Sequence, residues 1–79
     1  MKISDLAKGD RGIVTGYEKG ERVYRQKLLR MGLVKGCVFT LVRKAPLGDP
    51  VEIEIDCHKL TLRKQEADIL TVEKEQLDG

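Results

Sequence analysis

The chain has 79 residues and a formal net charge of +2; 35% of its residues are charged and 41% are hydrophobic. A chain of this length buries only about 60% of the surface that its unfolded form exposes, which excludes a deep substrate pocket inside a rigid scaffold. Aromatic residues are limited to Tyr17, Tyr24 and Phe39, so Ile, Leu and Val must build the core.

No apolar run approaches the roughly 20 residues that a membrane-spanning helix needs. The first residues, Met1 to Asp5, lack the basic and apolar stretches of a secretory signal, so we expect a cytoplasmic protein. In a reducing compartment Cys37 and Cys57 are expected to be free thiols. We expect one domain over residues 1–79, with its core at about 3–72 and a polar tail at 73–79.

The charges are unevenly distributed along the chain. Eight basic residues lie between Lys19 and Lys44, with Glu21 as the only acidic residue there. From Val51 to Gly79 the balance of charge is reversed, with four basic and eight acidic residues. The sequence therefore predicts a positive side and a negative side.

The first half of the chain predicts a turn, a strand and a helix. Ile3 to Leu6 is a lead-in turn with Leu6 pointing inward. Arg11 to Tyr17 has a strand composition, and Gly12 and Gly16 within it indicate a bend or a bulge. Glu21 to Met31 contains neither Gly nor Pro and is the clearest predicted helix.

Helical spacing places Tyr24, Leu28 and Met31 on one face of that helix, which should be buried. Gly32 follows where a left-handed C-cap is expected, and Leu33 supplies its usual apolar contact. Arg22, Arg25, Gln26 and Arg30 fall on the opposite half, around Leu29.

The second half of the chain predicts short strands and tight turns. Val51 to Asp56 alternates strictly, with Val51, Ile53 and Ile55 facing inward. The other expected elements are a strand at Cys37–Lys44, a loop at Ala45–Pro50, a returning strand at Lys59–Arg63, a helical turn at Gln65–Asp68 and a closing strand at Ile69–Val72.

These elements predict a mostly β protein: a small barrel of about five strands, with one inserted α-helix and a short helical turn before the last strand. Both SH3-like and OB-like barrels fit, and a single helix between the first two strands favours the SH3-like kind. We expect the barrel to close, which would leave no strand edge open.

Four segments in this order resemble the FeoA family. They are the opening Leu6, Gly9 and Ile13; Leu28 to Leu33 followed by Lys35-Gly36; the proline-rich loop Ala45–Pro50; and Thr61 to Ile69. The resemblance runs from about Ile3 to Val72. It implies an SH3-like barrel in the cytosol that assists FeoB, the membrane protein that carries a GTP-binding domain and moves ferrous iron.

One position departs from the family pattern. Most members have glycine at the hairpin turn where this chain has Cys57. If the turn requires a positive φ, Cys57 carries strain of roughly 1–2 kcal/mol. The alternative is a turn shifted by one residue.

The residues argue against an enzyme. The chain has one histidine, His58, one serine, Ser4, and no asparagine. It therefore lacks most of the residues from which a nucleophilic triad is built. Cys57 and His58 are neighbours in an extended segment and point to opposite faces. We therefore expect no catalytic activity and no cofactor.

Metal binding has only weak candidates. One histidine cannot supply the two that ferrous sites of the oxygenase type use. Cys37, Cys57, His58 and Asp56 make a site for iron or zinc only if the fold brings both thiols together. Otherwise we expect Cys37 to lie half-buried, with Cys57 and His58 exposed.

Two classes of macromolecular partner stay open, beside a direct metal carrier. A nucleic-acid-binding barrel agrees with the basic stretch, but three aromatics are few for base stacking. The preferred hypothesis is an accessory protein that binds FeoB through the outer helix face, with the Leu47 loop nearby. The predicted contact residues are Arg22, Arg25, Leu29, Arg30 and Leu47, because an apolar residue among charges resembles an interface core with a polar rim.

Overall fold

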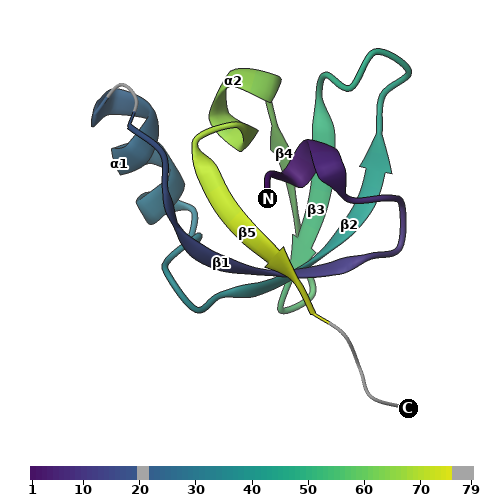
Figure 1. The fold of residues 1–79 in the computed structure, drawn as a ribbon, viewed down its shortest axis with the longest axis horizontal. Coiled ribbons are helices and arrows are strands. Elements are labelled where there is room, and N and C mark those ends of the chain that lie inside the picture. The colour runs from purple at the N-terminus through teal and green to yellow at the C-terminus, as the bar shows by residue number, and fades with distance from the viewer. Residues whose placement is uncertain (20–21, 76–79) are drawn as a thin grey trace.

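The computed structural model describes residues 1–19 and 22–75, and its elements follow the predicted order (Figure 1). They are the 3₁₀ helix η1 (Ile3–Asp5), β1 (Arg11–Tyr17), α1 (Arg22–Arg30), β2 (Val38–Lys44), β3 (Val51–Ile55), β4 (His58–Leu62), α2 (Lys64–Ala67) and β5 (Leu70–Lys74). The predicted first residue of the helix, Glu21, and the end of the predicted tail lie outside the described residues.

The strands of the described chain form one antiparallel sheet in the order β4-β3-β2-β1-β5. β1 lies between β2 and β5, and its ladder to β5 shifts register between Val14 and Gly16, which confirms the predicted bulge. Gly12 is needed for a different reason: a Cβ there would lie 2.6 Å from the ring of Phe39. The backbone of β1 thus lies close against the largest side chain of the core.

The expected closure of the barrel is wrong. β4 and β5 are the two edges of the sheet, and among the described residues no ladder joins them. The short helix α2 lies between them instead, because only residues 63–69 separate the end of β4 from the start of β5 (Figure 1). The fold is SH3-like but open on one side.

The core fills the concave side of the sheet and the space beneath α2. Phe39, Leu41, Ile53, Leu62 and Leu70 are almost fully buried, together with Ile3, Leu6, Val14, Leu28, Leu33 and Val72. Aliphatic side chains build most of this core, as the shortage of aromatics predicts.

The end of α1 follows the prediction closely. Gly32 has a φ of +90°, and its N–H donates to the Leu29 carbonyl at 3.1 Å. The N–H of Leu33 donates to the Leu28 carbonyl at 3.0 Å, which completes a Schellman motif. Leu28 and Leu33 are fully buried, so the cap also anchors the helix to the core.

The β3–β4 hairpin turns through two residues of positive φ, Asp56 at 46° and Cys57 at 70°. Two such residues define the tight turn whose twist suits a two-residue hairpin. The turn is therefore not shifted, and Cys57 occupies a left-handed conformation that glycine adopts without cost. Cys57 and His58 are exposed and Cys37 is half-buried, as expected.

Candidate functional site

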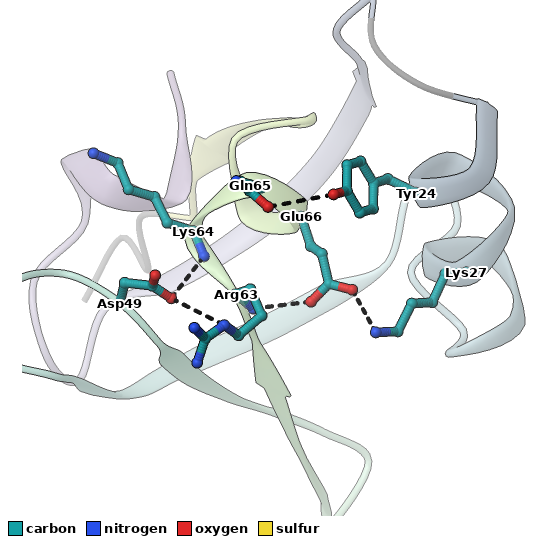
Figure 2. A network of polar contacts seen from close by, with 7 residues as sticks. All are labelled: Tyr24, Lys27, Asp49, Arg63, Lys64, Gln65 and Glu66. Atoms are coloured by element: carbon teal, nitrogen blue, oxygen red, sulfur yellow. Dashed lines mark hydrogen bonds and ion pairs between the residues drawn. The ribbon is translucent and has the colours of Figure 1, made fainter.

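Helix α1 is held in place by Glu66 of α2, which is only 3% exposed. The Glu66 carboxylate accepts a hydrogen bond from the Arg63 N–H at 2.9 Å and pairs with the Lys27 ammonium at 2.6 Å (Figure 2). Burial alone would raise the pKa of Glu66, but the hydrogen bonds from Lys27 and the Arg63 backbone, together with the positive charges of Lys27 and Arg63, outweigh burial and lower the pKa. Glu66 is therefore an ionised anchor for α1.

The same network continues to the loop between β2 and β3. The Asp49 carboxylate accepts a hydrogen bond from the Lys64 N–H at 3.0 Å and lies 3.6 Å from the Arg63 guanidinium (Figure 2). On the α1 side, the Tyr24 hydroxyl donates to the Gln65 side chain at 3.3 Å. The helix α2 is thus tied on one side to the loop and on the other to α1.

The outer face of α1 is basic with two exposed apolar residues. No acidic residue occurs between Arg22 and Arg30. Arg22 and Arg30 are exposed, Leu29 is 41% exposed and Val23 is 70% exposed. Among residues 1–19 and 22–75, no carboxylate forms an ion pair with Arg22, Arg25 or Arg30, whereas Lys27 pairs with Glu66.

Arg25 and Leu47 differ from the rest of the predicted contact set. The Arg25 guanidinium lies 5.1 Å from the centre of the Tyr17 ring, so part of its surface is already engaged within the molecule. Leu47 is 93% exposed on the β2–β3 loop. That loop lies on the far side of α2 from α1 (Figure 1). The structure brings Arg22, Arg25, Leu29 and Arg30 together on one helix, but it does not bring Leu47 beside them.

A groove of about 840 Å³ lies between the segment after α1 and the β3–β4 hairpin. Its apolar lining comes from Met31, Val34, Cys37, Val38, Ile55 and Leu60, and its polar lining includes Lys35, Asp56, His58 and Lys59. Sequence reasoning missed this groove because its two walls are some 20 residues apart in the chain. Val34, an apolar residue directly after the helix cap that is 48% exposed, was one local signal.

The metal candidates are only partly brought together. Cys37 and His58 both line the groove, whereas Cys57 is not part of its lining. Burial, and to a lesser degree the nearby Asp56 charge, raises the pKa of the Cys37 thiol, which makes it a poorer ligand. Within residues 1–19 and 22–75, no three side chains of His, Cys, Asp or Glu are grouped so that they can hold one metal ion. The described residues therefore do not fit a resident iron or zinc site.

The three aromatic side chains are all engaged within the molecule. Phe39 is 1% exposed. The Tyr17 hydroxyl donates to the Leu33 carbonyl at 2.6 Å, and its ring lies beneath Arg25. Tyr24 is half-buried against the core. Base stacking, on which single-strand binders depend, thus has no free platform here.

Comparison with known proteins decides the family. The family model of the FeoA domain matches residues 1–74. The chain belongs to the FeoA family. A Porphyromonas gingivalis protein named as a fusion of Fe(2+) transport protein A and the Fe(2+) transporter FeoB is 38% identical over 73 residues, which are 92% of this chain and 8% of that protein. The FeoA family is thereby associated with ferrous-iron transport.

Solved FeoA structures share the fold. The solution structure of FeoA from Chlorobium tepidum is 40% identical, with a TM-score of 0.85, over all of this chain and 74% of that one. A zinc-bound FeoA from Stenotrophomonas maltophilia, described as a prokaryotic SH3 domain protein, is 25% identical, with a TM-score of 0.79, over 92% of this chain and 89% of that one. These likenesses confirm the SH3-like prediction. In the described part of this chain, no helix has the length and apolar character to span a membrane.

Proposed function

We propose that this FeoA-family chain is a cytosolic accessory protein of ferrous-iron uptake that binds FeoB and has no catalytic activity of its own. The observation that carries the proposal is the Porphyromonas gingivalis fusion, in which a FeoA-like segment and FeoB belong to one polypeptide. Fusion raises the effective concentration of one module at the other, which is useful when the two must meet. Because this chain spans 8% of that protein, iron movement itself is assigned to the partner.

The outer face of α1 is the surface proposed to contact FeoB. Leu29 gives an apolar anchor, and Arg22 and Arg30 give a charged rim that fits an acidic patch on the partner's cytosolic side. The anchoring of α1 through Lys27 and Glu66 holds this face in a fixed orientation before binding. Leu47, on the far side of α2, is proposed as a separate contact.

The test is a pull-down of this chain against detergent-solubilised FeoB from the same source, with and without a GTP analogue. Leu29→Asp places a carboxylate in the centre of the proposed contact, and we expect binding to fall at least about tenfold, which is the effect of roughly 1.4 kcal/mol. Ser4→Asp adds the same charge on η1, away from α1, and should bind like wild type. Leu47→Asp measures the contribution of the loop independently.

Normal folding of Leu29→Asp together with wild-type binding would contradict the proposed α1 contact. Lack of binding by the wild-type chain in every nucleotide state would contradict the FeoB pairing itself. Salt separates protein docking from phosphate binding: affinity for nucleic acid falls steeply between low and moderate salt, whereas an interface with an apolar anchor keeps most of its affinity.

A further inference from the structure

Within the part of the chain that the structure describes, strand β4 has one edge without a partner strand. Its ladder runs only to β3, from Ile55↔His58 at the turn to Val51↔Leu62. In a two-residue hairpin the residues that flank the turn form a hydrogen-bonded pair, and hydrogen-bonded and non-hydrogen-bonded pairs then alternate. The N–H and C=O groups of Lys59 and Thr61 therefore point away from β3. Among the described residues, neither has a backbone partner on that outer side.

The apolar groove lies directly against this edge. Lys59 and Leu60 of β4 belong to its lining, and Met31, Val34 and Cys37 line the other wall. A strand laid along β4 directs every second side chain to the face on which Leu60 lies. Those side chains would enter the groove, while the main chain would pair with Lys59 and Thr61. The same site thus offers backbone hydrogen bonds and an apolar pocket, the two components of peptide recognition by strand addition.

The charges around the groove favour an acidic occupant. Among the described lining residues, two carry a positive charge, Lys35 and Lys59, and one carries a carboxylate, Asp56. Lys59 is exposed at the edge and lies opposite Glu54 in the ladder, so a carboxylate on an added strand would flank it from its open side. Opposite charges in neighbouring strands stabilise the pairing, whereas like charges destabilise it.

We propose that the groove and the open edge of β4 bind an extended segment of another protein by strand addition, and that this segment alternates apolar with acidic residues. The apolar residues occupy the pocket between Met31, Val34 and Leu60, and the acidic residues point to the opposite face of the added strand, beside Lys59. This surface is separate from the outer face of α1. The proposal goes beyond the FeoB pairing, and it is tested on this chain alone, so the two can fail independently.

The experiment uses the full chain labelled with ¹⁵N and a capped ten-residue peptide that alternates valine and glutamate. The matched control peptide carries lysine in place of each glutamate. We expect the glutamate peptide to shift the amide signals of Lys59, Thr61 and residues 31–38. We also expect it to slow hydrogen exchange at the Lys59 and Thr61 amides, whereas the lysine peptide should do neither.

Two variants of Thr61 separate backbone pairing from simple apolar contact. Thr61→Pro removes one outward N–H at a position where an edge strand tolerates proline, and Thr61→Val keeps that N–H. We expect Thr61→Pro to weaken binding of the glutamate peptide at least about fivefold relative to Thr61→Val, the effect of one lost hydrogen bond. Lys59→Glu leaves the main chain intact and should reverse the preference between the two peptides, which gives a second test if the proline variant does not fold.

Several outcomes would overturn the proposal. They are equal binding by the two Thr61 variants, equal binding of the two peptides, and signal changes confined to α1. Protection of the Lys59 amide that rises with protein concentration in the absence of peptide would also overturn it, because a second copy of this chain would then be the occupant.

Discussion

The two edges of the sheet differ in how the rest of the described chain covers them. At β5 the N-terminal residues cover the edge: the Val72 N–H donates to the Met1 carbonyl at 2.8 Å, and Ile3 of η1 is fully buried. At β4 the described residues supply no such cover, and the edge lies beside an apolar groove. Open edges invite pairing with other chains, and proteins usually protect them. An edge left open beside a groove is therefore the natural place to look for a partner.

The largest effect is expected on the covered side. Ile3→Ala removes a fully buried side chain that packs η1 onto the core, and it should lower the free energy of unfolding by about 3 kcal/mol. Val34→Ala trims a 48% exposed residue in the groove and should change stability by less than about 0.5 kcal/mol. Urea unfolding of both variants measures the difference between their free energies of unfolding. Similar losses would mean that the groove side is packed as tightly as the β5 side.

A smaller loss in the free energy of unfolding is expected for a change at Glu66, which lies on α2 between the two edges of the sheet. Glu66→Ala removes the hydrogen bond from the Arg63 N–H and the pair with Lys27, and it should cost about 1–2 kcal/mol. Because α1 then loses its anchor to α2, amide exchange in α1 should accelerate more than exchange in β5. Equal acceleration in both elements would show that Glu66 stabilises the whole fold rather than the position of α1.

The stabilisation by Glu66 should depend on pH. The folded-state pKa of Glu66 is lowered from its ordinary value of 4.5, so the folded protein binds the proton less readily than the unfolded chain. Its contribution is fully present above 4.5 and is lost as the pH falls through the folded-state pKa. The stability difference between wild type and Glu66→Gln should therefore be largest near neutral pH and should shrink in acid. A difference that does not change with pH would contradict an ionised Glu66.

The last effect, on the open side, is small and has the opposite sign. Cys57→Gly relieves a φ of 70° at the turn beside the groove and should stabilise the protein by about 0.5–1 kcal/mol, after the greater freedom of glycine in the unfolded chain is subtracted. Cys57→Val should destabilise, because a β-branched side chain tolerates this conformation poorly. Thermal unfolding of both variants gives the sign of each change.

Local features of this fold could be predicted from the sequence. The alternation of Val51, Ile53 and Ile55 marks β3, although Ile55 is only partly buried, and Gly32 marks the end of α1. The family comparison at Cys57 located a residue of positive φ. Each of these features is decided by neighbours within a few residues, which a single sequence contains.

Features that depend on distant segments could not be predicted. Nothing near Glu66 in the sequence indicates that its partner is Lys27, 39 positions earlier, although Glu66 three residues after Arg63 has the spacing of a capping glutamate. The open barrel depends on how far α2 separates β4 from β5. For the same reason, Leu47 was expected beside α1, whereas α2 lies between them (Figure 1).

The two thiols differ in their accessibility at the groove, which allows one of them to be labelled selectively. Cys57 is exposed at the hairpin tip, next to the groove but outside its lining, whereas Cys37 is half-buried within the lining. A raised pKa keeps the Cys37 thiol protonated, and thiol reagents react with the thiolate. A fluorophore can therefore be attached at Cys57 without mutating the chain, and its emission can report when a segment occupies the groove.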